Sequence, residues 1–310
     1  MSSRRRVFGV LVTYRRQHLL PDTLERILLQ TRPPDRLIVV DNEDSPETAR
    51  LVAECAADCN YDALTYIASP ENNGPAGGME IGMSRALQEA DDADWILTLD
   101  DDDPPLTVTD IERISEFADQ QRNGAAKLAG VGIVGAQFNW KTGMLVRLPD
   151  HQIEGAVRVD YLGSNHLALY CAGVMRDVGV FRGELFWREE VDYGLRVRRA
   201  GYQLVACGPM WKERRTASSR CNLRLSPSRT CEISWRKYYI TRNHVEMMCR
   251  FHRYDLALAC VLIQCVAKPA YTALRSPVQA GRGCRWAWRA AADGFLRRMG
   301  RRVDPVSFAT

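Results

Sequence analysis

Residues 95–105 of this 310-residue chain read WILTLDDDDPP, an apolar run that ends in four aspartates, Asp100–Asp103, and two prolines. A short apolar run bounded by turn residues predicts a buried β-strand. Four adjacent carboxylates at a strand end repel one another, and each raises the pKa of its neighbours. The run therefore predicts a ligand that offsets this repulsion.

Similar apolar runs precede residue 95, and segments with helical spacing separate them. We expect strands and helices in the order Val7–Thr13, Leu19–Gln30 (helix), Leu37–Val40, Pro46–Ala57 (helix), Leu64–Ala68, Met79–Glu89 (helix) and Trp95–Leu99. This alternation predicts an α/β fold with an open, mostly parallel sheet and helices on both faces. Ligands of such sheets bind outside the carboxyl ends of the strands. The strand ends Thr13-Tyr14, Asp41-Asn42 and Asp100–Asp103 should therefore converge on one crevice.

The second part of the chain has a mixed pattern. We expect strands at Val157–Leu162, Leu167–Met175 and Gln203–Cys207, a helix at Val191–Ala200, and helices beyond Trp235. The 46% hydrophobic content suffices for one large domain, or for one domain with a helical appendage.

The charge distribution says more than the net charge of +4, which is too small to indicate nucleic-acid binding by itself. Only Asp293 and Asp304 accompany eight arginines near the C-terminus: Arg275, Arg282, Arg285, Arg289, Arg297, Arg298, Arg301 and Arg302. Such a basic segment is usually a solvated face, but it also suits an anionic membrane surface. Beside Trp286, Trp288 and Phe295, the arginines favour a lipid-linked acceptor or a peripheral membrane contact through residues 281–310.

The ten cysteines include no C-x-x-C spacing and fall mostly within apolar patterns, which predicts buried free thiols. The N-terminal arginines run directly into a strand, so we expect no signal peptide. The apolar stretch Leu256–Ala267 is shorter than the ~20 residues that a spanning helix needs. We therefore expect a cytoplasmic protein, with peripheral contact to the inner face of the cell membrane left open.

A divalent cation explains the aspartate run best. Hard oxygen ligands on one loop suit Mg²⁺ or Mn²⁺, which bridge to substrate phosphates. The alternative is that Asp102 and Asp103 cap the next helix, which would not explain four carboxylates.

Six segments in this order resemble family 2 glycosyltransferases of the GT-A fold, especially bacterial galactofuranosyl- and rhamnosyltransferases. The segments are VLVTYRR (10–16), IVVDN (38–42), SPENNGPAGGMEIGMSRAL (69–87), WILTLDDDDPP (95–105), FWREEVDYGLRVRRAGY (186–202) and WRKYYITRN (235–243). The resemblance implies a Rossmann-like, mostly parallel mixed sheet flanked by helices over residues 1–232. A nucleotide-sugar half would cover about 1–105 and an acceptor half about 106–232, and a helical, basic and aromatic appendage would cover 233–310.

The resemblance also implies roles for single residues in a nucleotide-sugar site. Thr13 and Tyr14 would line the base and ribose, with Arg16 and Asn73 in the same site. Asp41 would accept a hydrogen bond from a pyrimidine, and Gly77 and Gly78 would let the backbone approach the diphosphate.

Within the aspartate run, Asp100 and Asp102 would form the Asp-x-Asp metal motif. Asp101 would face the ribose or a metal-bound water. The alternatives for the other residues are a strand-end turn at Asp41 and a helix-start turn at the two glycines.

The second acidic cluster would supply the catalytic base. The resemblance assigns this role to Glu190, with Glu189 and Asp192 as alternatives, because the acceptor hydroxyl must lose its proton as it attacks the anomeric carbon. Direct displacement inverts that carbon. The competing interpretation is that the glutamates are first-turn helix acids. Trp187 would pack against a sugar ring, or it would be a core or rim tryptophan.

One position departs from the family pattern. Many relatives carry a third metal ligand, a histidine, where this chain has Lys212, and an ammonium group cannot ligate a metal. Lys212 would contact the diphosphate, or aspartates and phosphates alone would hold the metal. The arginines between Arg214 and Arg229 would lie on a loop over the diphosphate, or on a solvated loop.

The expected function is inverting sugar transfer from UDP-galactofuranose or dTDP-rhamnose to a glycolipid, glycan or small-molecule acceptor, in cell-wall or natural-product synthesis. A nucleotidyltransferase is the second hypothesis, although Thr13–Arg16 replaces the Gly-rich basic signature that it would carry. A non-catalytic sugar-nucleotide or glycan-binding protein is the third.

Overall fold

The computed structural model describes residues 4–124, 127–164, 166–217, 231 and 234–304. The chain divides into two compact units. We call them the sheet unit (Met1–Gln137, Val146–Gly183 and Glu190–Leu223) and the helical unit (Phe138–Leu145, Glu184–Glu189 and Arg224–Thr310).

The sheet unit is built on an eight-stranded sheet with the order β3-β2-β1-β4-β10-β5-β11-β8. Strands β1 to β4 are parallel to one another, β10 is antiparallel to both β4 and β5, β11 is parallel to β5, and β8 is antiparallel to β11. The strands are β1 (Val7–Thr13), β2 (Arg36–Asp41), β3 (Leu64–Ala68), β4 (Trp95–Asp100), β5 (Leu128–Gly132), β8 (Ala156–Val159), β10 (Ala168–Cys171) and β11 (Gln203–Cys207). The predicted α/β class with a mostly parallel mixed sheet is confirmed.

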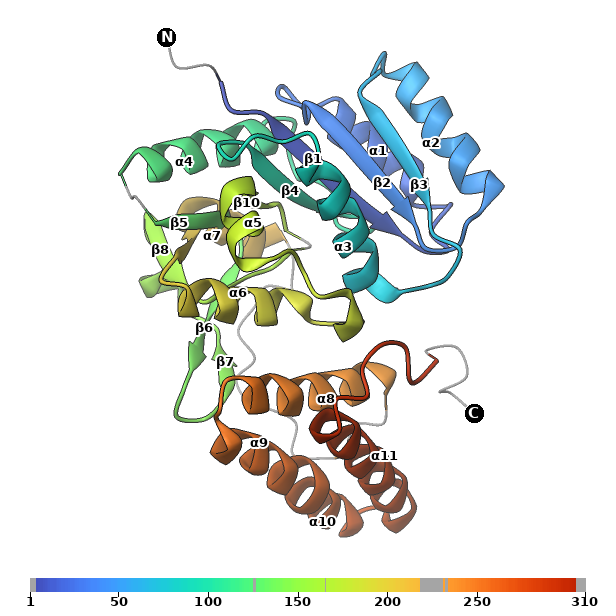
Figure 1. Cartoon of the computed structure of the whole chain (residues 1–310), viewed down its shortest axis with the longest axis vertical. Coiled ribbons are helices and arrows are strands. Elements are labelled where there is room, and N and C mark those ends of the chain that lie inside the picture. The colour runs from blue at the N-terminus through green and yellow to red at the C-terminus, as the bar shows by residue number, and fades with distance from the viewer. Residues whose placement is uncertain (1–3, 125–126, 165, 218–230, 232–233, 305–310) are drawn as a thin grey trace. The chain divides into compact units, whose positions relative to one another are not determined.

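Helices flank this sheet (Figure 1). They are α1 (Leu20–Leu28), α2 (Pro46–Asp58), α3 (Gly74–Leu87), α4 (Asp110–Gly124), α5 (Ala172–Val178), α6 (Glu189–Arg199) and α7 (Gly208–Ala217). Helix α3 packs against β1 and β2, α2 against β3, and α4 against β5 and β10. Three short strands, β6 (Gly135–Asn139), β7 (Met144–Val146) and β9 (Tyr161–Leu162), lie outside the main sheet, and β6 pairs with β9.

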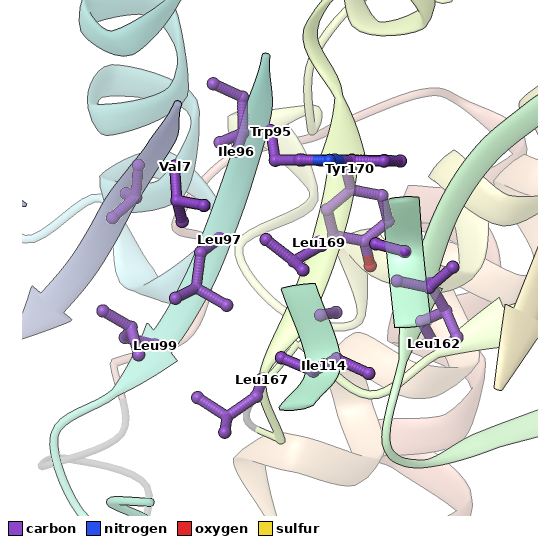
Figure 2. Packing of buried hydrophobic residues seen from close by; sticks show 14 of the residues in the cluster. Val7, Trp95, Ile96, Leu97, Leu99, Ile114, Leu162, Leu167, Leu169 and Tyr170 are labelled. Carbon is purple, nitrogen blue, oxygen red and sulfur yellow. The ribbon is translucent and has the colours of Figure 1, made fainter. Parts of the chain in front are cut away.

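The core lies at the centre of the sheet, where β4 pairs with β10. Figure 2 shows Trp95 and Leu97 of β4 beside Tyr170 and Leu169 of β10, and all four side chains are nearly or fully buried. Strands that are covered on both faces read as continuous apolar runs, which is why β1, β2 and β4 were recognisable in the sequence.

Helix α3 lies unusually close to β1 because of its glycines. A Cβ atom on Gly82 would lie 2.3 Å from Val10 Cγ1, and one on Gly78 would lie 2.4 Å from Val12 Cγ1. Both distances are shorter than real Cβ contacts allow, so only glycine fits at either position. The two glycines thus fix the distance between α3 and β1, and with it the position of the first turn of α3.

Three sequence predictions of secondary structure were wrong. The single strand expected at Val157–Leu162 is divided at Asp160 into β8 and β9, which belong to different sheets. The helix expected at Met79–Glu89 begins at Gly74, because Gly74 and Pro75 start a helix rather than extend the loop. The strand expected at Leu167–Met175 ends at Cys171 and gives way to α5. There the backbone amides of Ala172 and Gly173 donate to carbonyls of the loop before β4, which turns the chain out of the sheet.

The helical unit contains α8 (Trp235–Arg250), α9 (Tyr254–Val261), a π-helical segment (Leu262–Ala267), α10 (Lys268–Ala273) and α11 (Pro277–Phe295). Helix α11 packs against α8 and α10. Every cysteine that the structure describes is a free thiol, as predicted; Cys171, Cys207 and Cys265 are buried and the others are partly buried.

The apolar helix is longer than the sequence indicated. Tyr254–Ala273 forms a 20-residue helical run that is long and apolar enough to cross a bilayer. Its most apolar 18-residue window has a mean hydropathy of 1.5, and 33% of that window is buried within the protein. The expectation that Leu256–Ala267 is too short therefore underestimated its length. The π turn directly before Pro269 explains this, because such turns accommodate local breaks in the hydrogen-bond ladder.

Candidate active site

Three of the four aspartates form one cluster at the carboxyl end of β4. Asp100, Asp101 and Asp102 each offer a carboxylate oxygen, and these oxygens lie within 4.8 Å of one another. Asp101 is buried, whereas Asp100 and Asp102 are partly exposed. We call these three residues the aspartate triad; its geometry suits one divalent cation with hard oxygen ligands.

Neighbouring strand and loop residues hold the triad in place. The Thr13 hydroxyl, at the end of β1, donates to Asp101 Oδ2 at 2.9 Å. The Thr23 hydroxyl donates to the backbone carbonyl of Asp101, also at 2.9 Å. Arg16 donates to Asp102 Oδ2 at 2.9 Å. The predicted residues Thr13 and Arg16 are therefore brought together with the aspartates, as the strand-end argument required.

Asp103 takes no part in the triad. Its carboxylate is contacted by Arg214 of α7, and His166 Nδ1 lies 2.5 Å from Asp103 Oδ2. All three side chains are largely buried. Neither Asp102 nor Asp103 caps the following helix, because α4 begins only at Asp110. The fourth aspartate thus anchors its loop to the protein.

The electrostatics of the triad favour a bound cation. Burial raises the pKa of Asp100 to about 7, and the negative charges of Asp102, Asp101 and Asp103 add to this shift. Burial also raises the pKa of Asp101, against the hydrogen bond from Thr13 that lowers it. Without a cation the site disfavours a full set of negative charges, and a divalent ion would reverse that preference.

The end of β2 contributes Asp41 and Asn42. Asp41 is fully buried and accepts hydrogen bonds from the backbone amides of Glu43 and Ser45 and from the Tyr66 hydroxyl at 2.8 Å. Its carboxylate therefore builds the strand-end turn, and its contact with a pyrimidine stays a prediction. The sequence placed Asn42 at the strand end but assigned it no contact. It is 3% exposed, and its Oδ1 atom has no hydrogen-bond partner among the described residues.

Tyr14 and the loop before α3 carry the remaining predicted nucleotide contacts. Tyr14 is partly exposed, with the Arg15 guanidinium 5.1 Å from its ring centroid. The Asn73 side chain donates to Ser69 Oγ and to the Glu71 carbonyl and so shapes the loop. Gly77 and Gly78 lie inside α3 rather than in a loop, and Gly78 faces β1. The structure thus shows a packing role for Gly78; the diphosphate contact of the glycines stays a prediction.

The three candidate bases have different surroundings. Asp192 is fully buried and is held by Arg182 at 3.0 Å and Arg196 at 2.7 Å. Glu189 is 4% exposed. Glu190 is partly exposed, and the Tyr161 hydroxyl lies 3.5 Å from its Oε1 atom. Of the three carboxylates, Glu190 is the most accessible to a substrate.

The segment before α6 is anchored within the helical unit. The Asn243 side chain donates to the carbonyls of Leu185 at 2.9 Å and Trp187 at 2.6 Å, and Arg242 donates to the Leu185 carbonyl at 2.8 Å. Phe186, with a φ of 64°, stacks on Tyr239. Arg188 also has a positive φ, 65°, so the segment is strained and depends on these contacts.

Trp187 is partly exposed and lies against Trp235 and Arg236. These contacts fit the rim tryptophan that was the alternative to sugar stacking. Arg242 and Asn243, at the end of the sequence segment WRKYYITRN, therefore have a structural role, because they hold the chain that leads into Glu190.

Helix α7 separates its cations onto two faces. Trp211, Arg214 and Arg215 are buried on one face, and Arg215 contacts Asp150 and the Leu148 carbonyl. Lys212 points away from Arg214 and is 42% exposed, with its amine 3.5 Å from Glu154. Two residues apart on a helix, Lys212 and Arg214 point in nearly opposite directions.

The predicted loop of arginines was therefore wrong for Arg214 and Arg215, which are buried in a helix because they pair with acidic and carbonyl groups of the sheet unit. Arg220, Arg224 and Arg229 lie outside the described residues.

The comparisons with known proteins agree with this geometry. The family description "Glycosyl transferase family 2" matches residues 10–179, more than half of the chain. Galactofuranosyltransferase GlfT1 of Mycolicibacterium smegmatis is 43% identical over 103 residues, 33% of this chain and 32% of the relative. GlfT1 of Mycobacterium tuberculosis (strain H37Rv) is 43% identical over 99 residues, 31% and 30% of the two chains. The matched segment spans about a third of the length of these curated relatives.

Solved structures support the fold over nearly the whole chain. Mannosyltransferase PcManGT from Pyrobaculum calidifontis, in complex with GDP-Man and Mn²⁺, superposes with a TM-score of 0.57 at 15% identity and covers 96% of this chain and 89% of its own. S. aureus TarS 1–349 in complex with UDP-GlcNAc gives 0.57 at 13% identity, with 94% and 82% covered. The family match, together with the GT-A fold and an aspartate triad at the end of β4, identifies this chain as a glycosyltransferase that belongs to glycosyl transferase family 2.

Proposed function

We propose that this protein is an inverting glycosyltransferase that moves a sugar from a nucleoside-diphosphate donor to an acceptor hydroxyl. The observation that carries the proposal is the aspartate triad, whose oxygens converge at the carboxyl end of β4 next to the end of β1. In open α/β sheets this edge is the ligand-binding crevice. The partial similarity to galactofuranosyltransferases favours UDP-galactofuranose as the donor, with dTDP-rhamnose second.

The donor's diphosphate would lie at the triad. Asp100 and Asp102 would hold Mg²⁺ or Mn²⁺, and Asp101, fixed by Thr13, would face the ribose or a metal-bound water. Bound there, the cation supplies Lewis-acid stabilisation of the negative charge that develops on the leaving diphosphate. The donor set fits such an ion, because all ligands are carboxylate oxygens and burial keeps the pKa of Asp100 high in its absence. PcManGT, which shares the fold, has been solved with Mn²⁺.

The nucleoside would bind beyond the ends of β1 and β2. Tyr14 offers a partly exposed ring, and the buried Asn42 Oδ1 atom accepts no hydrogen bond from any residue that the structure describes. Together with the carboxylate of Asp41 they supply the polar contacts that a pyrimidine needs. Asn73 lies directly before α3, Gly77 lies in its first turn and Gly78 follows that turn, and the backbone amides at this helix start favour a diphosphate.

Glu190 would act as the general base. It takes the proton of the acceptor hydroxyl as that oxygen attacks the anomeric carbon and the nucleoside diphosphate leaves, so the carbon is inverted. Asp192 does not suit this role, because two arginines already hold its buried carboxylate. Glu189 is less accessible than Glu190.

We also propose roles for Trp187 and Lys212, the domain boundaries and the kind of acceptor. Trp187 would contact the acceptor, and Lys212 would contact the leaving diphosphate. Residues 1–232 would form the catalytic domain, and 233–310 an appendage that helps to bind a glycolipid, glycan or small-molecule acceptor. The reaction would take place in the cytoplasm.

A panel of UDP-, dTDP- and GDP-sugars, assayed for nucleotide release with Mg²⁺ or Mn²⁺, tests the proposal. We expect release of a nucleoside diphosphate from one donor, and a loss of 10²–10⁴-fold in kcat for Glu190→Gln with donor binding retained. Release of pyrophosphate when sugar phosphates and nucleoside triphosphates are supplied would identify a nucleotidyltransferase instead. Binding of a sugar nucleotide without any turnover would indicate a non-catalytic protein.

A further inference from the structure

The helical unit exposes a long apolar surface. On the 20-residue helix Tyr254–Ala273 and the turn after it, Asp255 and Arg275 are the exposed charged side chains, and the other exposed large side chains are apolar or aromatic. They are Tyr254, Leu258, Leu262, Ile263, Val266, Leu274 and Val278, and we call them the apolar ridge. Leu262 is 61% exposed and Leu274 is 83% exposed. The small residues exposed between them, Ala267, Ala270 and Ala273, add no charge.

The π-helical segment keeps this ridge on one side. The ridge residues Tyr254, Leu258, Leu262, Val266 and Leu274 follow a spacing of four residues or its multiple. In a regular α-helix, four residues overshoot one turn by about 40°, so such a row would wrap around the helix. The π turn over Leu262–Ala267 holds more residues per turn, and it offsets this drift in the middle of the row.

Basic residues accompany the ridge, and acidic residues are scarce. Between residues 254 and 292 the chain has five lysines and arginines and one carboxylate, Asp255, which Arg253 holds at 2.7 Å. On α11, Arg282, Arg285 and Arg289 continue from Val278 at spacings that share one helix face. Helices α10 and α11 pack against each other, as Figure 1 shows. A continuous apolar ridge beside a row of arginines matches the acyl chains and the negative headgroups of an anionic bilayer.

We propose that the apolar ridge docks the protein onto an anionic lipid bilayer, with Leu258, Leu262 and Val266 inserted below the headgroups and the α11 arginines at their level. The docking surface is then the helix Tyr254–Ala273 and the turn after it, and not only the basic segment 281–310 that the sequence favoured. The proposal is independent of the donor and of the catalytic base. The helix lies along the interface and does not span the bilayer, because its other face packs within the protein through Leu256, Ala257 and Cys265.

Flotation of the full chain with vesicles of phosphatidylcholine, with and without phosphatidylglycerol, tests this surface. We expect binding to the anionic vesicles that weakens as salt rises. The triple variant Leu258→Gln, Leu262→Gln, Val266→Gln should lose at least about 100-fold in vesicle affinity. Arg282→Gln and Arg285→Gln should each cost about fivefold on anionic vesicles only. The matched control is Leu29→Gln, Val108→Gln, Met144→Gln, which changes three equally exposed apolar residues off the ridge and should bind like the wild type.

The pair Leu274→Gln, Val278→Gln repeats the test at the two most exposed positions, where the fold is least affected. Circular dichroism shows whether each variant is folded. The proposal would be overturned if the wild type did not bind anionic vesicles, or if folded ridge variants bound as well as the wild type. It would also be overturned if alkaline carbonate could not release the wild-type protein, because that result would indicate a spanning helix. A wild-type dimer that the ridge variants convert to monomer, with vesicle binding unchanged, would show that the ridge binds a second copy instead.

Discussion

Replacing Asn243 by alanine should damage stability and catalysis through the segment that precedes Glu190. Asn243 is 1% exposed, and its amide donates to the carbonyls of Leu185 and Trp187 and accepts from Arg242. The change removes three hydrogen bonds and leaves two carbonyls and one guanidinium N–H without that partner. Each buried group that loses its partner costs roughly 1–3 kcal/mol, and Arg242 still contacts the Leu185 carbonyl. We expect a total loss of about 2–4 kcal/mol.

The effect on catalysis follows from the strained backbone. Phe186 and Arg188 hold positive φ angles only while the surrounding contacts keep them there. Once released, the segment would shift the first turn of α6, and a displacement of about 1 Å at a reacting group can cost 10²-fold. We expect kcat for Asn243→Ala to fall about 10- to 100-fold, with a change of less than about threefold in KM for the donor.

Urea unfolding and steady-state nucleotide release measure the two effects. Tyr238→Phe is the control on the same helix: it loses the hydroxyl that donates to Asp293, a bond that involves no residue of the segment 184–189. We expect it to lower stability and leave kcat unchanged. If Asn243→Ala lost stability but kept its kcat, or if Tyr238→Phe lowered kcat equally, the segment would not position the base.

Three further predictions concern single contacts. Thr13→Val removes a hydrogen bond to a buried carboxylate and should lower the free energy of unfolding in urea by about 1.5–3 kcal/mol. The control Thr98→Val loses a bond to a neutral carbonyl and should lower it by about 0.5–1.5 kcal/mol. Equal losses would contradict a charged acceptor at Asp101. Gly82→Ala should lower the free energy of unfolding by about 1–3 kcal/mol, because its Cβ would lie 2.3 Å from a Val10 methyl. The double variant Gly82→Ala, Val10→Ala should lose less stability than the two single variants added together. Strict additivity would refute the clash. Burial and nearby positive charges lower the pKa of His244 to about 4. The free energy of unfolding should therefore fall, by at most about 3 kcal/mol, as pH falls from about 6.5 towards 4. A His244→Gln variant should lose this part of the pH dependence, and an unchanged profile would contradict the prediction.

The nucleotide half of the sheet could be predicted because its signals are local. Strands β1, β2 and β4 are apolar runs that end in polar residues, and parallel strands place their ends at one edge. The triad and its contacts with Thr13 and Arg16 follow from that rule. The start of α3 was misplaced because its glycines resemble a loop in sequence, whereas in the structure they allow close packing against β1.

Contacts between distant segments could not be predicted. Asp103 meets His166 and Arg214, which are far away in the chain, and a lone histidine or arginine gives no sequence signal. Arg242 and Asn243 were visible as a family motif, but their hydrogen bonds to backbone carbonyls leave no pattern in side-chain chemistry. The apolar ridge was underestimated for a local reason, since Lys268-Pro269 looks like a helix end and the π turn lets the helix continue.

The central claim is that Asp100, Asp101 and Asp102 bind a nucleoside diphosphate through a divalent cation. The direct measurement is a calorimetric titration of UDP, dTDP and GDP into the protein, in Mn²⁺ and in EDTA. One nucleotide should bind at least about tenfold more tightly in Mn²⁺ than in EDTA, a difference of about 1.4 kcal/mol or more. Equal affinity with Mn²⁺ and with EDTA would contradict the claim.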